Sequence, residues 1–577
     1  MSKGNQTELS ISSVVQSLVS CQFSSQSGPE TLYRSIERPF MKLHLEDKLI
    51  QEQLFKGWFG LEKESLRVMQ STGLFASTPH PFNDPHIVQD FAENQTEINT
   101  DVYPSWKQAR QACEDLTCKM QVVLNDMGEV LWPFSNPSII RSPHDIPMLK
   151  SGSRQAIEYR EYLESRYGRS KMVYSGIHYN FSFRDEMLMQ EWKYHPEYET
   201  YREFKDRFYL DLVCKVVWYG WLIDLLFNAS PVYDGSLQSE QDLGKPAFSG
   251  MSSMRNSALG YWNYFTPYFD YSSLEAYTSS IDRYVKEGLL KAPRELYYPI
   301  RIKPKGKYDL DLLNEEGINH IELRMVDLNP YEISGISEED AWFCHLFLVY
   351  LACCDDIELS WKDQIYAQQN FKSASIYSMD QTRILYDTET SINPKIAATI
   401  LLDGVERFFS DLDPQAVEAI DHQKLKLLKP EQYRLAARVR RDFANFAQDG
   451  LKQACWLQKM AIYQTKNELP DKGGADPNLQ NSAPKQPSLE EEELESFDES
   501  QLEGEEPQNF EDSHLEDEET RNFEEFQIED DQSQSVEEPR LEDEEMQLDC
   551  SSQELAQELT QELSQELTGE SNSWPII

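Results

Sequence analysis

The chain has 577 residues, 40% of them hydrophobic, and a formal net charge of −46. This acidic balance argues against nucleic acid and anionic membrane surfaces as main partners, because both attract clustered Lys and Arg. Nine scattered cysteines without a CxxC pair, no signal peptide, and apolar runs too short to cross a bilayer predict a cytoplasmic protein that is not inserted in a membrane.

The first element with chemical character follows a polar N-terminal segment over residues 1–50, in which we expect helical pieces. Residues 60–68, GLEKESLRV, are predicted to form a buried strand. Side chains alternate faces along a strand, so Glu62 and Glu64 should point one way and Lys63 the other. Two neighbouring carboxylates repel each other, and a Mg²⁺ ion between them would relieve the repulsion. A solvated strand face with surface charge is the alternative explanation.

Helices and strands then alternate irregularly along the chain. Apolar residues at helical spacing predict helices over 104–125, 152–168, 203–228, 338–356 and most of 395–467, the third of them a single long buried helix. A loop rich in small residues at 248–255 is suited to close approach of a ligand. This mixture favours an α+β fold over a regular βαβ series.

Two further strands repeat the plan of a polar face opposite an apolar face. Residues 176–183 place His178 on the polar face, and residues 320–325 place Glu322 and Arg324 there. Strands of this kind would line a cavity together with the first one. For each strand taken alone, an ordinary amphipathic strand with a solvated face explains the pattern equally well.

The last part of the chain differs sharply in composition. Residues 471–577 contain 35 Asp and Glu but only 4 Lys and Arg, about two thirds of the net negative charge. Such a segment cannot offset its ordering entropy, so disorder is predicted. Near its end Gln-Glu-Leu recurs every four residues, which suits either a segment that folds on a protein partner or a solvating tail. We therefore divide the chain into an N-terminal segment 1–50, a catalytic domain 51–470 and an acidic tail 471–577.

Common phosphate-binding and hydrolase motifs are missing, but six other stretches stand out. GxxxxGK[ST], HExxH and GxSxG do not occur, and no GxGxxG opens a helix. The six stretches are GLEKESLRV, DFAENQTEI, SGIHYNFSF, SSMRNSALGY, ELYYPIR and IELRMVDLNPYEISGI. With them the chain resembles bacterial-type glutamate–cysteine ligase from about residue 50 to 355. The similarity is strongest to the ligase half of fused bifunctional enzymes of glutathione synthesis.

The resemblance implies a curved, largely antiparallel sheet with flanking helices, similar to the catalytic fold of glutamine synthetase. The metal ligands of the family correspond to Glu62, Glu64, Asp90, Glu97, His178 and Glu322. Arg324 corresponds to an arginine expected near the transferred phosphoryl group, and with Arg255 it makes up the implied catalytic pair. Arg255, Tyr261 and Tyr297 correspond to positions that line the cysteine pocket.

The implied reaction joins the γ-carboxylate of L-glutamate to the amine of L-cysteine at the expense of ATP, the first step of glutathione biosynthesis. The γ-carboxylate takes the γ-phosphoryl group, and the amine then displaces phosphate. The implied cofactor is Mg²⁺, as two or three ions, and a histidine ligand would also accept Mn²⁺. Two alternatives stay open: a ligase of the same mechanism with another amine acceptor, and a non-catalytic interaction protein that works through its acidic tail.

Overall fold

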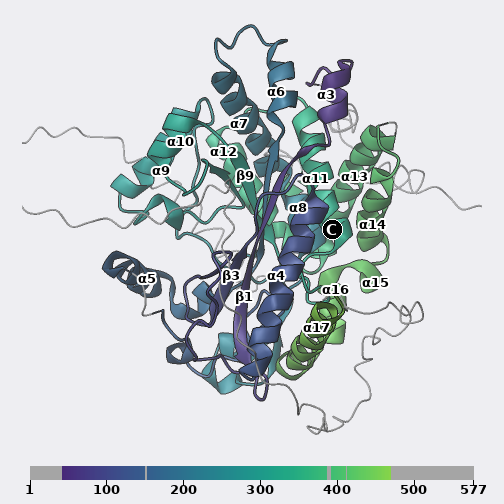
Figure 1. Cartoon of the computed structure of the whole chain (residues 1–577). Helices are drawn as coiled ribbons and strands as arrows, with labels where there is room; N and C mark the ends of the chain where they lie inside the picture. The colour runs from purple at the N-terminus through teal and green to yellow at the C-terminus, as the bar shows by residue number, and fades with distance from the viewer. Residues whose placement is uncertain (1–41, 150–152, 386–390, 411, 469–577) are drawn as a thin grey trace, which may run out of the picture. The chain divides into compact units, whose positions relative to one another are not determined.

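The computed structural model describes residues 42–149, 153–385, 391–410 and 412–468. Figure 1 shows these residues as a sheet, in which β1 (Gly57–Met69) is the longest strand, with helices around it. The acidic tail, predicted to be disordered, lies outside the described residues, as do residues 1–41 of the predicted N-terminal segment. The description that follows concerns only the described part of the chain.

Seven strands form one sheet in which all neighbours pair antiparallel. They are β1 (Gly57–Met69), β2 (Ile87–Gln89), β3 (Gln95–Asn99), β4 (Glu129–Trp132), β5 (Ile177–Phe183), β8 (Ile300–Lys303) and β9 (His320–Val326). Their order is β2-β3-β1-β5-β9-β8, and β4 pairs with the C-terminal end of β1. Two small sheets pair β6 (Val232–Asp234) with β7 (Pro246–Phe248) and β10 (Ile384–Leu385) with β11 (Ser391–Ile392). The predicted α+β class with an antiparallel sheet is confirmed.

Helices account for most segments between the strands (Figure 1). Their bounds are α3 (Lys48–Gln53), α4 (Trp106–Asp126), α5 (Arg154–Tyr167), α6 (Asp185–Trp192), α7 (Tyr201–Tyr219), α8 (Trp221–Phe227), α9 (Leu274–Lys286), α10 (Leu310–Glu316), α11 (Glu338–Cys353), α12 (Trp361–Ala374), α13 (Pro394–Ser410), α14 (Ala416–Leu428), α15 (Pro430–Tyr433), α16 (Leu435–Asp442) and α17 (Phe446–Glu468). Within the described residues, none is long and apolar enough to span a membrane.

The prediction of one long helix over 203–228 is wrong, because the structure has two helices there. A capping box formed by Thr200 and Glu203 starts α7, which ends at Tyr219, and α8 starts at Trp221. Gly220 separates them, and glycine has a low helix propensity. A Cβ at this position would lie 2.5 Å from the carbonyl oxygen of Val216, so the close contact at the break requires glycine.

The main hydrophobic core joins one face of the sheet to helices α7, α8 and α11. β1 contributes Phe59 and Leu61, and β5 contributes Tyr179 and Phe181; each is at most 2% exposed. Full burial of an aliphatic or aromatic side chain stabilises the fold by about 1.5–3 kcal/mol. Leu43 packs in the same core, ahead of residue 51 where the predicted catalytic domain begins. The alternating residues of the strands are thereby left for the opposite, polar face.

His345 on α11 is a polar side chain buried in this apolar core. Its ring centre lies 4.9 Å from that of Phe59 and 5.3 Å from that of Phe181. Neither ring nitrogen has a hydrogen-bond partner within the described residues. Burial lowers the pKa of His345 to about 3, because the surrounding rings cannot solvate an imidazolium.

We expect His345 to make the protein less stable in mild acid. In the unfolded chain its pKa is near 6.5, whereas the folded ring stays neutral down to about pH 3. Below pH 6.5 the unfolded chain therefore binds a proton that the folded chain does not, and the free energy of unfolding decreases as the pH falls. The loss amounts to about 2 kcal/mol between pH 8 and pH 5. Urea unfolding of the wild type and of His345→Leu at both pH values measures it. The same pH dependence in both proteins would contradict this expectation.

Candidate active site

The first strand of the sheet turns its two glutamates away from the core, as predicted. Glu62 and Glu64 are partly exposed, whereas Lys63 is only 6% exposed. The Lys63 ammonium donates to the carbonyl oxygen of Ile333 at 2.6 Å and to Thr117 Oγ1 at 3.3 Å. It does not lie between the glutamates, so the pair is not held together as a salt bridge by this lysine.

The register of the sheet brings polar residues from four strands into one row. Glu64 on β1 lies opposite Glu97 on β3, and Glu62 on β1 lies opposite His178 on β5. The pairing of β5 with β9 adds Glu322 to the same face. Opposed residues of an antiparallel pair have Cβ atoms about 5 Å apart, so these side chains are direct neighbours although the chain separates them widely.

His178 is the centre of this row. Its Nδ1 lies 2.8 Å from Glu62 Oε2 and 3.3 Å from Glu322 Oε1. Its Nε2 lies 3.5 Å from Glu64 Oε1. One donor atom each from Glu62, Glu97 and His178 lies within 4.8 Å of the other two. This spacing of oxygen and nitrogen donors is suited to a single divalent cation.

Asp90 and Glu97 lie in a crowded acidic environment and resist ionisation. Loss of hydration and the charge of Glu64 raise the pKa of Asp90, which directly follows β2, to about 7. Loss of hydration and the charges of the three neighbouring acids raise the pKa of Glu97 well above its usual value. Like charges this close disfavour simultaneous ionisation. A bound dication would remove that obstacle, so the donor set fits a metal site.

Cations gather around Glu322 at the other end of the row. Its fully buried carboxylate contacts the guanidinium of Arg324, and Lys303 Nζ lies 3.4 Å away. Arg301 Nη1 follows at 3.9 Å. Burial acts to raise the pKa of Glu322, but these cations hold it well below its usual value. Three cations around one carboxylate place fixed positive charge at this end of the row, where it is suited to bind phosphate.

A cavity of about 310 Å³ opens against this face of the sheet. The predicted site residues that line it are Glu64, Asp90, His178, Arg255, Tyr261, Tyr297 and Arg324. The other predicted residues, Glu62, Glu97 and Glu322, do not line the cavity but contact or adjoin His178 in the row. The structure therefore brings all of the predicted site residues to one place, in two groups. The volume is at the lower end of the range for small-molecule sites.

The predicted pocket residues Arg255, Tyr261 and Tyr297 lie together in the cavity. Arg255 Nη2 donates to the carbonyl oxygen of Arg324 at 2.6 Å, and its guanidinium packs on Gly176, where a Cβ would lie 2.5 Å from Arg255 Cζ. The ring centres of the two tyrosines are 3.9 Å apart. Burial raises the pKa of both tyrosines, so their hydroxyls stay protonated and can donate hydrogen bonds.

Three cavity residues carry no signal in the sequence: Tyr159 and Arg160 on α5, and Arg294. The Arg294 guanidinium lies 3.9 Å from the ring centre of Tyr159, and Arg160 Nε donates to the carbonyl oxygen of Asp90 at 3.4 Å. Helical spacing predicts α5 but does not distinguish an arginine that faces a cavity from one that faces solvent. These residues add positive charge and an aromatic surface to the cavity wall.

Fold and site together define an α+β protein with a cavity lined by acidic, basic and aromatic side chains. Residues 43–289 and 265–374 match the family model for glutamate-cysteine ligase, and the chain belongs to this family. The glutathione biosynthesis bifunctional protein GshAB of Clostridium perfringens is 33% identical over 393 residues, which cover 66% of this chain and 49% of that protein. The glutamate–cysteine ligase of Clostridium acetobutylicum is 31% identical over 399 residues, 60% of this chain and 82% of that protein.

A solved structure shows the same fold. The bifunctional glutathione synthetase of Pasteurella multocida superposes with a TM-score of 0.64 at 25% identity, over 74% of this chain and 55% of that one. The chain thus spans about half the length of the bifunctional relatives that it matches. The family resemblance predicted from the six sequence stretches is confirmed.

Proposed function

We propose that the chain is a glutamate–cysteine ligase that joins the γ-carboxylate of L-glutamate to the amine of L-cysteine and converts ATP to ADP and phosphate. The observation that carries this proposal is the row of acids around His178 that meets the cations around Glu322 at one cavity. Transfer of a phosphoryl group to a carboxylate needs divalent cations for the triphosphate and fixed positive charge for the transferred group. Family membership supports the same reaction.

The acids and the histidine are the proposed ligands of two or three Mg²⁺ ions, with Mn²⁺ as a substitute. They are Glu62, Glu64, Asp90, Glu97, His178 and Glu322. When bound, the ions would neutralise the triphosphate and the charge that develops during transfer. Glu322 contacts Arg324 in this structure, so its use as a ligand requires that Arg324 turn from the carboxylate to the phosphate.

Basic and aromatic side chains are the proposed binding groups for the reacting substrates. Arg324, assisted by Arg301 and Lys303, would hold the transferred phosphoryl group through charge-assisted hydrogen bonds. Arg255 would pair with the carboxylate of cysteine in a forked geometry, and the hydroxyls of Tyr261 and Tyr297 would orient the zwitterion. Enclosure of the cavity would keep water from the γ-glutamyl phosphate, which otherwise hydrolyses.

ADP release tests the proposed reaction. The rate with glutamate plus cysteine should greatly exceed the rate with glutamate alone, and mass spectrometry should identify γ-glutamylcysteine. Stimulation by a different amine and not by cysteine would establish a ligase of the same mechanism with another acceptor. Failure of every amine to stimulate ADP release, with the protein folded, would refute the ligase activity.

We expect Gly176→Ala to raise the KM for cysteine about ten-fold, equivalent to about 1.4 kcal/mol of binding. The new Cβ would lie 2.5 Å from the Arg255 guanidinium, which can move only by leaving its place in the cavity. The fold should persist, because the group that must move is the end of a flexible side chain. Gly60→Ala is the control: its nearest new contact is an ordinary 3.7 Å to Asn180 Cβ, so KM should not change. Equal KM values for both variants would contradict the proposal that Arg255 binds cysteine.

We propose that residues 51–470 contain the catalytic domain and that residues 471–577 are dispensable for turnover. α17 must be kept, because Phe446 packs against Trp132 and Gly450 lies close to the same ring. A chain that ends at residue 470 should keep turnover within about two-fold of the full chain. A chain that ends at residue 445 should lose its folded state, since it uncovers Trp132. Loss of turnover in the longer truncation would show that the acidic tail takes part in catalysis.

A further inference from the structure

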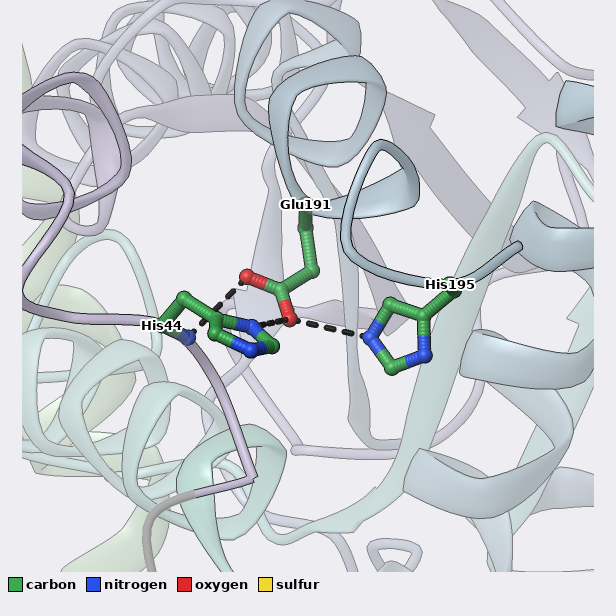
Figure 2. A group of neighbouring side chains, drawn as sticks. All are labelled: His44, Glu191 and His195. Atoms are coloured by element: carbon green, nitrogen blue, oxygen red, sulfur yellow. Dashed lines mark hydrogen bonds and ion pairs between the residues drawn. The ribbon is translucent and has the colours of Figure 1, made fainter.

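A second cluster of metal-binding side chains lies where the chain before α3 meets the end of α6. Figure 2 shows the imidazoles of His44 and His195 on either side of the Glu191 carboxylate. One donor atom from each of the three lies within 4.8 Å of the other two. None of the three lines the cavity described above. We propose that this cluster binds a first-row transition-metal ion, Zn²⁺ or a close analogue, separately from the ligase reaction.

Distances within the cluster are close to those of a tetrahedral metal site. Glu191 Oε1 lies 2.8 Å from His44 Nδ1 and 3.0 Å from His195 Nε2. Ligand bonds of about 2.0–2.2 Å to Zn²⁺ at tetrahedral angles place neighbouring donors roughly 3.3–3.5 Å apart. Each nitrogen therefore needs to move from the Glu191 oxygen by only a few tenths of an ångström to admit the ion, and the donor atoms of the two histidines already lie within 4.8 Å of each other.

The buried charge of Glu191 also favours a cation. Its side chain is 0% exposed, and within the described residues its ion pairs are with these two histidines. Burying a carboxylate is costly unless it is paired. In this structure the carboxylate contacts the two rings and accepts a third hydrogen bond, at 3.1 Å, from the backbone N–H of His44. A dication held by the carboxylate and both imidazoles would provide stronger compensation than these three hydrogen bonds.

Neighbouring groups fix the orientation of both imidazole rings. His195 Nδ1 lies 2.9 Å from Glu197 Oε1, which aims the opposite nitrogen, Nε2, at the cluster. A carboxylate behind a metal-binding histidine is the usual arrangement that sets its tautomer and strengthens it as a ligand. The ring of His44 stacks on Tyr194 at 4.0 Å between centroids. Both nitrogens are thus directed toward Glu191 before any ion binds.

The donor types select a transition metal rather than Mg²⁺. Two imidazoles and one carboxylate suit Zn²⁺, whereas the acid-rich row around His178 suits harder cations. His44 is 32% exposed, so solvent can reach the cluster and supply a fourth ligand. An ion held by His44, Glu191 and His195 would link the segment before β1 to α6, the helix that follows β5. Strands β1 and β5 carry Glu62, Glu64 and His178, so the ion would stabilise the strands that hold the row of polar residues around His178.

Metal titration of the full chain, stripped of metal with a chelator, tests the proposal. The His178→Gln background is used so that the catalytic row does not obscure the result. In this background we expect one equivalent of Zn²⁺ to bind by calorimetry, and Co²⁺ to give the visible absorption of a tetrahedral complex. Anomalous scattering at the zinc edge should show a peak between His44 and His195.

Two further variants separate a metal site from a hydrogen-bonded structural cluster. Glu197→Gln should weaken Zn²⁺ binding about ten- to a hundred-fold. Glu191→Gln keeps the size of the side chain and a hydrogen-bonding oxygen but loses the charge. This variant should no longer bind the equivalent of Zn²⁺, while its circular dichroism spectrum stays unchanged. No Zn²⁺ binding up to about 100 µM in the His178→Gln protein would overturn the proposal. The proposal would also be overturned if one equivalent of Zn²⁺ still bound to both Glu191→Gln and His195→Gln, or if the anomalous peak lay elsewhere.

Discussion

Glu64→Gln is expected to lower the turnover of the proposed ligase by about 10²- to 10³-fold and, at the same time, to raise the thermal stability of the metal-free protein. Turnover falls because a neutral amide replaces a carboxylate that lines the cavity 3.5 Å from His178. We expect stability to rise because the charge of Glu64 helps to raise the pKa of Asp90 and of Glu97, and we expect this repulsion to outweigh the attraction of Glu64 to Arg324 and His178. Removing it relieves repulsion that a bound cation would otherwise relieve.

The two effects are measured separately. The rate of ADP release at increasing Mg²⁺ gives the catalytic loss, and melting in the presence of a chelator gives the change in Tm. Glu287→Gln, an exposed glutamate next to the C-terminal end of α9, is the control and should change neither. Unchanged turnover would exclude Glu64 as a ligand, and a lower Tm without metal would contradict the proposed crowding of charge.

Glu322→Gln should also remove turnover but should change stability in the opposite direction. Glu322 is surrounded by Arg324, Lys303 and Arg301, so loss of its charge leaves three cations, which are only 10–19% exposed, without this compensation. The sign of the stability change therefore distinguishes the two ends of the row, although turnover falls in both variants. Equal shifts of Tm in Glu64→Gln and Glu322→Gln would show that the row is not divided in this way.

Alternation along single strands is sufficient to predict the direction of the side chains in the candidate site. Glu62 and Glu64 share a face and Lys63 takes the other, because side-chain period in a strand is fixed by backbone geometry. Cross-strand partners could not be derived in the same way. The pairing of Glu64 with Glu97 depends on the register, which is set by loops and by packing of the whole sheet. Family resemblance, and not periodicity, brought Asp90 and Glu97 into the predicted set.

Features that depend on contacts between distant segments had no local signal. The cationic side chains around Glu322 come from β8 and β9. They lower the pKa of Glu322 only when these two strands are paired. His44 lies 147 positions from Glu191, so spacing alone does not suggest that they share a site. The sequence does not predict the break at Gly220, because the continuous apolar run around it outweighs the low helix propensity of a single glycine.

Arg67→Met is expected to give a large loss of stability, about 3–5 kcal/mol. Arg67 belongs to the same strand as Glu62 and Glu64, but its side chain and that of Glu129 on β4 are both 0% exposed. Its Nη1 lies 2.8 Å from Glu129 Oε2, and its Nη2 donates to the carbonyl oxygens of Thr78 and Glu93, each at 2.9 Å. Removing the guanidinium leaves a buried carboxylate without its cation and two carbonyl groups without this donor.

A double-mutant cycle shows whether the loss comes from the uncompensated charge. Glu129→Met in the Arg67→Met background removes the buried carboxylate, and replacement of a whole buried ion pair by apolar groups is often close to neutral. We therefore expect the double variant to be more stable than Arg67→Met alone, by urea unfolding. Arg154→Met is the control, because it breaks an ion pair with Glu158 in which the arginine is 91% exposed. It should leave the midpoint of urea unfolding unchanged.

Additive losses in the cycle would mean that Arg67 acts mainly through its bonds to the backbone of Thr78 and Glu93 and not through Glu129. In that case Arg67 would stabilise the end of the GLEKESLRV strand through backbone hydrogen bonds and not through an ion pair. With coupling between Arg67 and Glu129, this strand combines a half that carries proposed metal ligands, for which the cation would come from solution, with a structural half, in which the protein supplies the cation itself. Only the first half should then respond to Mg²⁺, so Mg²⁺ should raise the Tm of Arg67→Met and of the wild type by similar amounts.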